Sequence, residues 1–174
     1  TSQYINELSG LPNEAAFLKT VAPKDFGYIA TARIRDFREM LVVSNAASRL
    51  DLFKNLANRL SFLARDEEIY HVDSDMIAWI VKNEYVDDIP GYFDIASAML
   101  QAPVMARENR IKIAVTFGIS DDSIEKSKIA SELAFADGKK WTWYDQEVDH
   151  AIGQKLDLLV ELDHAIEEGN LDVV

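Results

Sequence analysis

Cysteine is absent from the 174 residues of the chain. This absence excludes a disulfide, a thiolate zinc site and a cysteine nucleophile. Long apolar runs are absent too: the longest, Met76 to Val81, is far shorter than the roughly 20 residues that a membrane-spanning helix needs. No basic-then-apolar targeting segment opens the sequence. We therefore expect a cytoplasmic protein whose residues make no membrane contact.

Positive charge is scarce. The chain has 30 acidic and 18 basic residues, which gives a net charge of −12. Such a field repels phosphate backbones, so nucleic acid is not an expected partner. Apolar residues make up 48% and charged residues 28%, and the length suffices for one domain with a full core. Neither an internal repeat nor a low-complexity segment interrupts the sequence.

Hydrophobic periodicity and turn chemistry predict alternating helices and strands. Helices are expected at residues 14–21, 36–43, 46–64, 92–101, 121–137 and 149–168. Strands are expected at residues 26–34, 111–120 and 141–144, a hairpin at 68–82, and the start of another strand at 171–174. We expect Asn13 to cap the first helix and Asp121 or Asp122 to cap the fifth. This order predicts an α+β fold with a mixed sheet, not a doubly wound one.

The hairpin at residues 68–82 has a polar tip, Asp73-Ser74-Asp75, between two β-rich runs. The backbone of a hairpin tip can approach the phosphates of a ligand closely where it has no side chains, that is, at glycine residues. Here the tip carries carboxylates instead, which are either cation ligands or, more simply, turn residues in water. The three histidines are scattered along the chain, which favours packing or surface roles over catalysis. Trp141 and Trp143 alternate on a short strand, which predicts one in the core and one exposed.

Four motifs, taken together in their order and spacing, resemble those of the GGDEF domain, the diguanylate cyclase family that makes cyclic di-GMP from two GTP. They are the segments Leu8 to Asn13 (LSGLPN), Ile34 to Arg38 (IRDFR), Ala114 to Ser120 (AVTFGIS) and Ala134 to Lys139 (AFADGK). The resemblance covers about the whole chain. It implies a nucleotidyl cyclase-like fold with a central, mostly antiparallel five-stranded sheet flanked by helices.

The same resemblance implies a domain organisation. Residues 1–148 would be a degenerate GGDEF domain, and residues 149–170 a helix and linker toward a following EAL phosphodiesterase domain. Residues 171–174 would begin the next segment. The family's topology places the first strand beside the hairpin, which predicts ion pairs of Arg33 or Arg35 with Asp73 or Asp75.

The resemblance further implies that the family's active site is lost. Its signature Gly-Gly-(Asp/Glu)-Glu-Phe falls on Asp73, Ser74, Asp75, Met76 and Ile77. A metal-binding Asp falls on Arg33, two guanine-reading residues fall on Leu41 and Leu50, and a phosphate-binding Lys and Arg fall on Phe135 and Lys139. The family uses Mg²⁺ with GTP, and phosphoryl transfer depends on positioning and charge neutralisation. We therefore expect no catalytic residue, no metal and no cofactor, and the family's inhibitory Arg-x-x-Asp is missing from residues 64–68.

These observations predict an inactive domain that regulates its neighbours in cyclic di-GMP signalling. The expected partners are an adjoining EAL domain and an upstream sensor domain, with a second copy in a homodimer as a further candidate. Two alternatives stay open. One is a divergent diguanylate cyclase that still uses Asp75, and the other is a domain that binds GTP as an allosteric effector without turnover.

Overall fold

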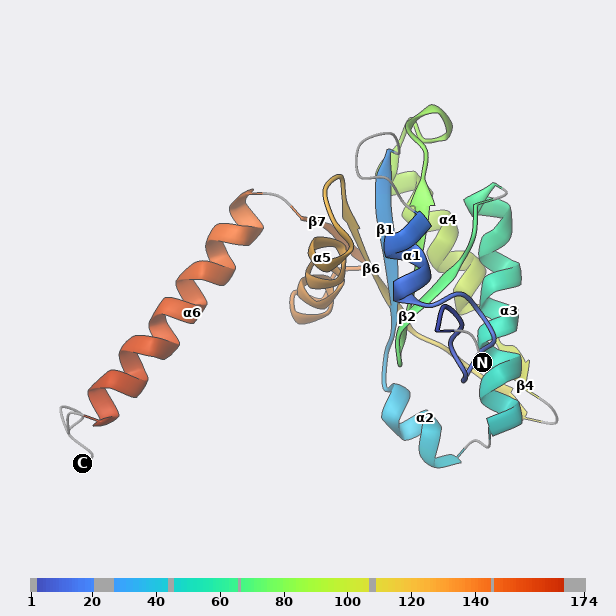
Figure 1. The fold of residues 1–174 in the computed structure, drawn as a ribbon, viewed down its shortest axis with the longest axis horizontal. Helices are drawn as coiled ribbons and strands as arrows, with labels where there is room; N and C mark the ends of the chain where they lie inside the picture. Colours follow the sequence, from blue (N-terminus) through green and yellow to red (C-terminus); the bar gives the residue numbers. More distant parts are fainter. Residues whose placement is uncertain are drawn as a thin grey trace. The chain divides into compact units, whose positions relative to one another are not determined.

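The structure is a computed structural model that describes residues 3–20, 27–43, 46–65, 67–106, 109–144 and 146–167. The chain divides into two compact units, Thr1–Trp143 and Tyr144–Val174. Elements of the first unit, in chain order, are α1 (Glu14–Thr20), β1 (Tyr28–Ile34), α2 (Phe37–Val43), α3 (Ala46–Ala64), β2 (Tyr70–Asp73), β3 (Met76–Val81), the 3-10 helix η1 (Asn83–Tyr85), α4 (Ile89–Gln101), β4 (Val104–Ala106), β5 (Asn109–Ile111), β6 (Val115–Ser120), α5 (Ile124–Ala136) and β7 (Trp141–Trp143) (Figure 1). The second unit contains α6 (Gln146–Glu167).

A five-stranded sheet with the order β2-β3-β1-β6-β7 forms the centre of the first unit. Four of its strands pair antiparallel, and only β7 runs parallel to its neighbour β6. This arrangement confirms the predicted α+β fold with a mostly antiparallel five-stranded sheet. Strand β1 lies in the middle, with Ala30 opposite both Trp79 of β3 and Ile119 of β6.

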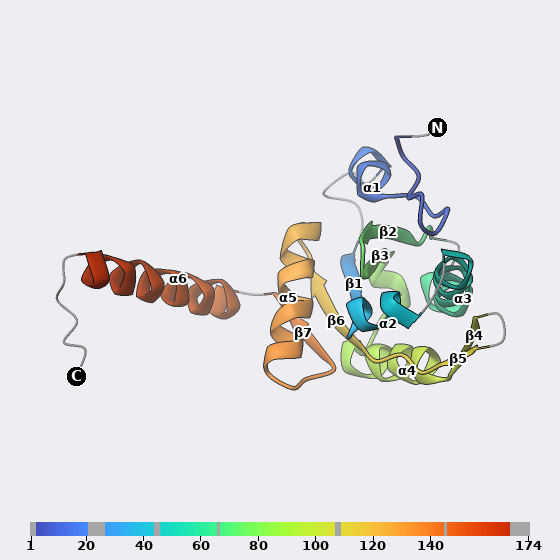
Figure 2. The same ribbon diagram turned by 90° about the horizontal axis from the view of Figure 1, so that it is seen from below.

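Both faces of the sheet are covered by helices. Helices α3 and α4 lie on one face and α1 and α5 on the other (Figure 2). Because side chains alternate between faces along a strand, Ala30, Ala32 and Ile34 join the core under α3 and α4. Ile29 joins the smaller cluster on the other face. The end of β1 therefore presents Arg33 to the face that α5 covers.

Helix α5 packs unusually close to the sheet because β6 has a glycine beneath it. A Cβ added to Gly118 would lie 2.1 Å from the carbonyl oxygen of Ser127 and 2.4 Å from the amide nitrogen of Ser131. Hydroxyl groups also join the two layers. The Oγ1 of Thr31 donates to the Ser127 carbonyl at 2.9 Å, and the Oγ1 of Thr116 donates to the Ser131 carbonyl at 3.1 Å. This close packing and these hydrogen bonds fix the position of α5 relative to β1 and the hairpin.

Helix starts agree with the sequence expectations in part. The side-chain oxygen of Asn13 accepts from the amide of Ala16 at 3.0 Å, which confirms Asn13 as the cap of α1. The expected cap of α5 was wrong, because Ser123 accepts from the amide of Lys126 at 3.2 Å and the helix begins only at Ile124. Helix α4 begins at Ile89, earlier than the expected residue 92, since Pro90 fits the first turn of a helix.

The single strand expected at residues 111–120 was also wrong. Ile111 belongs to β5, which pairs with β4 in a separate two-stranded sheet, and β6 begins only at Val115. Ile113 between them is buried, so the apolar pattern reflects burial and not one continuous strand. Nor is one tryptophan of β7 buried and the other exposed. Both Trp141 and Trp143 are half-buried and pack against the main core.

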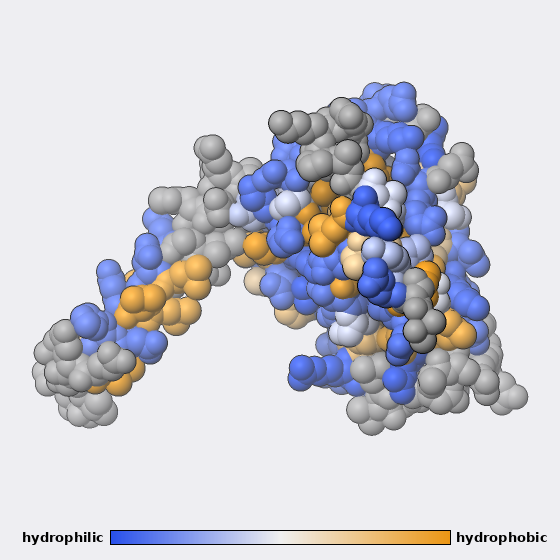
Figure 3. All heavy atoms as spheres, viewed as in Figure 1, coloured by the Kyte–Doolittle hydropathy of each residue, from blue (hydrophilic) through white to orange (hydrophobic). Residues whose placement is uncertain are grey.

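Helix α6 is amphipathic and longer at its start than the expected 149–168. Its exposed apolar side chains include Leu156, Leu159, Val160 and Ile166, and they follow the helix as a strip (Figure 3). In the part of the chain that the structure describes, no helix has both the length and the apolar composition to cross a membrane. The strand start expected at residues 171–174 lies outside the described residues.

Candidate functional site

The tip of the β2–β3 hairpin is held on two sides. Asp73 lies opposite Met76, which leaves Ser74 and Asp75 as the turn, and the register shifts between His71 and Asp73. On one side, the carbonyl oxygen of Asp75 accepts from the amide of Ile34 at 2.7 Å, which joins the tip to the end of β1. The tip is therefore a fixed part of the sheet.

The buried side chain of His71 contacts the backbone of the tip on its other side. Its Nε2 lies 3.3 Å from the carbonyl oxygen of Ser74, and its Nδ1 lies 2.7 Å from the Oγ of Ser9. The ring is fully buried and stacks on Phe53, with centroids 4.0 Å apart. Burial lowers the pKa of His71, although the neighbouring carbonyls and carboxylates of the tip act in the opposite direction. His71 is thus a packing residue that ties the tip to the loop before α1, as the scattered histidines predicted.

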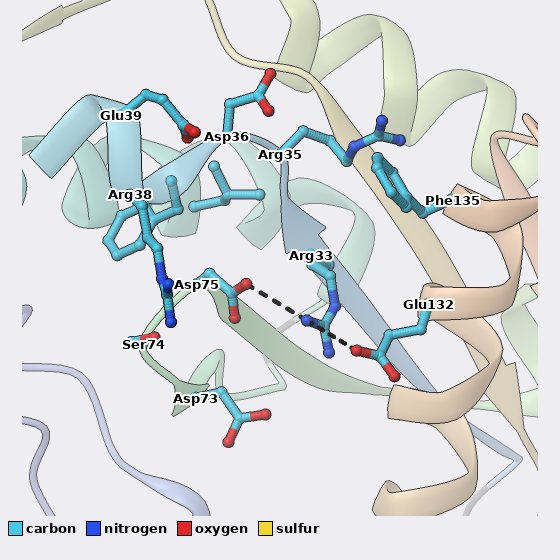
Figure 4. A pocket seen from close by; sticks show the side chains of 12 residues that line it. Arg33, Arg35, Asp36, Arg38, Glu39, Asp73, Ser74, Asp75, Glu132 and Phe135 are labelled. Atoms are coloured by element: carbon cyan, nitrogen blue, oxygen red, sulfur yellow. Dashed lines mark hydrogen bonds and ion pairs between the residues drawn. The ribbon is translucent and has the colours of Figure 1, made fainter. Parts of the chain in front are cut away.

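Arg33, at the end of β1, lies between two carboxylates. Its Nη1 is 3.4 Å from Oδ2 of Asp75 and 3.3 Å from Oε1 of Glu132 on α5 (Figure 4). The side chains of Arg33 and Asp75 are 23% and 26% exposed, so their contact is partly shielded from water. One of the predicted pairings, Arg33 with Asp75, is confirmed.

The other tip carboxylate, Asp73, pairs with a lysine of α5. The Nζ of Lys128 lies 3.2 Å from Oδ1 of Asp73 and 2.6 Å from Oε1 of Glu14 on α1. Its side chain is 17% exposed. Burial lowers the pKa of Lys128, but the two carboxylates outweigh it, and the net result is a raised pKa. This lysine therefore remains charged and joins α1, the hairpin and α5.

A cavity of about 790 Å³ lies between the hairpin tip, the β1–α2 junction and α5 (Figure 4). Three arginines and five carboxylates line it, together with Ile34, Phe37, Ser74 and Phe135. The charged residues are Arg33, Arg35 and Arg38, and Asp36, Glu39, Asp73, Asp75 and Glu132. Acid therefore exceeds base in the lining, which disfavours a polyanionic ligand.

One wall of the cavity is formed by the β1–α2 junction. The guanidinium carbon of Arg35 lies 3.1 Å from the centroid of the Phe135 ring, a cation–π contact between this junction and α5. Asp36 follows with a φ of 55°, a left-handed conformation that Asp tolerates better than most residues. Its carbonyl accepts from the amide of Met40 at 3.2 Å and so starts α2.

The cavity brings together some of the residues singled out from the sequence and leaves others apart. Arg33, Asp73, Ser74, Asp75 and Phe135 line it. Met76 and Ile77 are buried on opposite faces of the sheet. Leu50 is half-buried on α3, and Lys139 is exposed after α5. Leu41 belongs to α2, but its side chain lies outside the described residues.

Two charged residues of this site, Lys128 and Glu132, were missed from the sequence. They are four positions apart on α5, a spacing that places them on one helix face. The spacing could have drawn attention to the two residues, but on its own it predicts an ion pair between them within the helix. The structure instead directs each side chain across to the hairpin or β1. Among the described residues, no group of three or more His, Asp or Glu side chains is placed to hold a metal ion.

The architecture is that of GGDEF domains, the diguanylate cyclase fold. The GGDEF domain of the Pseudomonas aeruginosa protein TpbB (YfiN) superimposes with a TM-score of 0.71 and 14% identity, over 86% of this chain and 99% of that one. A diguanylate cyclase/phosphodiesterase from Caldicellulosiruptor saccharolyticus gives a TM-score of 0.67 and 18% identity, over 80% and 91% of the two chains.

A third solved structure is similar, the GGDEF domain of DgcB from Caulobacter crescentus in complex with c-di-GMP. Its TM-score is 0.66 and its identity 14%, over 83% of this chain and 97% of that one. No protein-family model matches the sequence, and no curated protein matches it. At these identities the solved structures establish the fold alone.

Proposed function

We propose that the chain is a degenerate GGDEF domain that does not synthesise cyclic di-GMP and acts instead as a regulatory or interaction module. The observation that carries this proposal is the ion pair between Arg33 and Asp75. The resemblance assigns Arg33 to the position of a metal-binding Asp and Asp75 to the surviving acid of the signature. Here a guanidinium, which has no lone pair to offer, lies against that acid.

The residues present do not fit the divalent cation that the fold family uses with GTP. Magnesium requires oxygen ligands in near-octahedral geometry. Asp75 supplies a carboxylate, but its Oδ2 lies 3.4 Å from a cationic nitrogen of Arg33. The next position of the signature is Met76, which is fully buried and has a thioether in place of a carboxylate. These residues therefore offer no ligand set through which a metal could assist a reaction.

The regulatory role also rests on the helix that comes after the last strand of the sheet. We propose that α6 connects this domain to a following EAL domain, and that an upstream sensor domain acts through the same route in the cytoplasm. The resemblance of the last residues to a GGDEF–EAL connection supports this, as does the name of the C. saccharolyticus structure. Phosphodiesterase activity of the full-length protein should then differ from that of the downstream domain alone. Equal activities would contradict the regulatory role.

A second candidate function, GTP binding without turnover, is favoured by the size of the cavity. Its volume of about 790 Å³ falls within the range of small-molecule sites, about 300–1,000 Å³. The excess of carboxylates in its lining and Leu50 at a guanine-reading position oppose this function. Isothermal titration calorimetry with GTP separates the two proposals. Saturable GTP binding that the Arg35→Ala substitution weakens would support the effector role. The absence of any heat of binding would exclude it and favour the interaction module.

A further inference from the structure

A second hollow lies outside the cavity described above, between the end of α3 and the start of α4. This groove has a volume of about 320 Å³. Its lining is mostly apolar and consists of Phe62, Leu63, Val86, Tyr92 and Ile95, with Arg65, Asp87, Asp88 and Gly91 at its polar margin. It shares no lining residue with the larger cavity. The groove is therefore a separate surface feature.

Two of the apolar walls are exposed to an unusual degree. Phe62 on α3 is 77% exposed and Ile95 on α4 is 52% exposed, and they flank the groove from different helices. Covering an apolar side chain of this size with a partner removes it from water, which favours binding. Aromatic residues are enriched in the cores of protein interfaces and among the residues that dominate their binding energy. These walls have the composition of an interface core.

The floor of the groove is already ordered. The hydroxyl of Tyr92 accepts from the indole nitrogen of Trp79 at 2.8 Å and donates to the Leu63 carbonyl at 3.4 Å. Tyr92 is buried, and burial raises its pKa to about 12, so this hydroxyl remains protonated. A partner would meet a preformed surface and would bind with little loss of conformational entropy on this side.

Charge indicates the chemistry of the occupant. Asp87 and Asp88 are exposed at the margin, and they outnumber Arg65, the one basic residue among the described residues that line the groove. They belong to a chain with a net charge of −12. A symmetric contact with a second copy would bring four carboxylates to this margin against two Arg65 guanidinium groups, so negative charge would still be in excess. Helix α6 is equally unsuited, since its 22 residues contain six acids and a single lysine.

We propose that this groove binds a segment of a partner protein that inserts one large apolar side chain between Phe62 and Ile95 and places lysine or arginine beside Asp87 and Asp88. The volume of about 320 Å³ suits one or two such side chains and is at the lower limit for a small-molecule site. The groove lies outside the cavity that Arg33 occupies. The inference therefore holds whether or not that cavity turns over GTP.

The test uses the 174-residue chain and two synthetic helical peptides. Both peptides carry leucine or phenylalanine at positions i, i+3, i+4 and i+7; one has lysine and arginine at the other positions, and its counterpart has glutamate. Binding is followed by fluorescence anisotropy and by amide chemical shifts. The protein variants are Phe62→Ala, Ile95→Ala and the double variant Asp87→Asn/Asp88→Asn. The control is Leu18→Ala on α1, where the side chain is 59% exposed.

We expect the basic peptide to bind, to shift the amides of Phe62, Asp87 and Ile95, and to lose about tenfold in affinity with either alanine variant. The double Asn variant and added salt should weaken it several-fold, and the acidic peptide should not bind. The wall residues are exposed, so all variants should keep the melting temperature of the parent chain. Equal binding by Phe62→Ala and Leu18→Ala would overturn the inference. The inference would also be overturned if the amide signals of the groove residues changed with protein concentration in the absence of peptide, because that would show self-association through the groove.

Discussion

Nη1 of Arg33 lies 3.4 Å from Oδ2 of Asp75, and this contact joins the end of a central strand to the tip of the neighbouring hairpin. Oε1 of Glu132 approaches the same nitrogen at 3.3 Å. One arginine therefore neutralises carboxylates from two elements that the fold brings together. In the family that the sequence resembles, an acid occupies this strand position. With Arg33 at this position, the carboxylate of Asp75 has a cationic partner within the chain and needs no metal ion to balance it.

Arg33 and Asp75 should be coupled in stability. A double-mutant cycle with Arg33→Ala and Asp75→Ala should give a coupling free energy of about 0.5–1 kcal/mol, since the pair is partly shielded from water. Urea denaturation measures it. Arg38→Ala is the matched control, because this arginine lines the same cavity but is exposed and makes no ion pair with described residues. An Arg33→Ala variant as stable as the parent chain would contradict the assignment.

Lys128 should contribute more to stability than its neighbour on the same helix. Replacing it with methionine leaves Glu14 and Asp73 near one another without a cation, and we expect a loss of about 1–2 kcal/mol. Lys126→Met removes an exposed pair with Asp122 and should cost less than about 0.5 kcal/mol. Amide hydrogen exchange should also become faster in α1 for the Lys128 variant alone. Equal losses of stability in the two variants would show that the contacts of Lys128 with Glu14 and Asp73 contribute no more than an exposed ion pair does.

Gly118→Ala should destabilise the chain by about 3 kcal/mol, because the added Cβ would meet the backbone of α5 and the helix would have to move. Gly138→Ala is the comparison. Gly138 has a φ of 67° and nothing within 4 Å of an added Cβ, so only its left-handed backbone resists the change. That change should cost about 1–2 kcal/mol. The prediction fails if thermal unfolding ranks Gly138→Ala as the more damaging substitution.

His71 should make the stability fall as the pH falls below about 6.5, the pKa of an unfolded histidine. Because the folded pKa is lowered by burial, the unfolded chain takes up this proton first, and protonation favours unfolding. A His71→Gln variant should lose this part of the pH dependence, while the carboxylate contribution stays. The free energy of unfolding, measured in urea at about pH 7.5 and about pH 5.5, gives the slope. Identical slopes in variant and parent would contradict a neutral buried His71.

The hairpin was accessible from sequence because its signal is local: two β-rich runs flank a turn-forming cluster. Its position beside the first strand was implied by the resemblance to GGDEF domains, since no local pattern indicates which strands pair. The contact of Lys128 with Asp73 was not accessible, because it joins residues 55 positions apart that share no local pattern. Burial of Ile113 extended an apolar run beyond the true start of β6, which produced one long strand where two short ones exist. Tertiary burial and strand pairing give the same apolar signal, and only the fold separates them.

Synthesis of cyclic di-GMP tests the central claim most directly. The chain is incubated with excess GTP and either Mg²⁺ or Mn²⁺, alongside an active GGDEF domain as the positive control, and the product is measured by liquid chromatography and mass spectrometry. We predict no product above the protein-free blank with either metal. Formation of cyclic di-GMP at a rate that Asp75→Asn abolishes would contradict the account and identify the domain as a divergent cyclase.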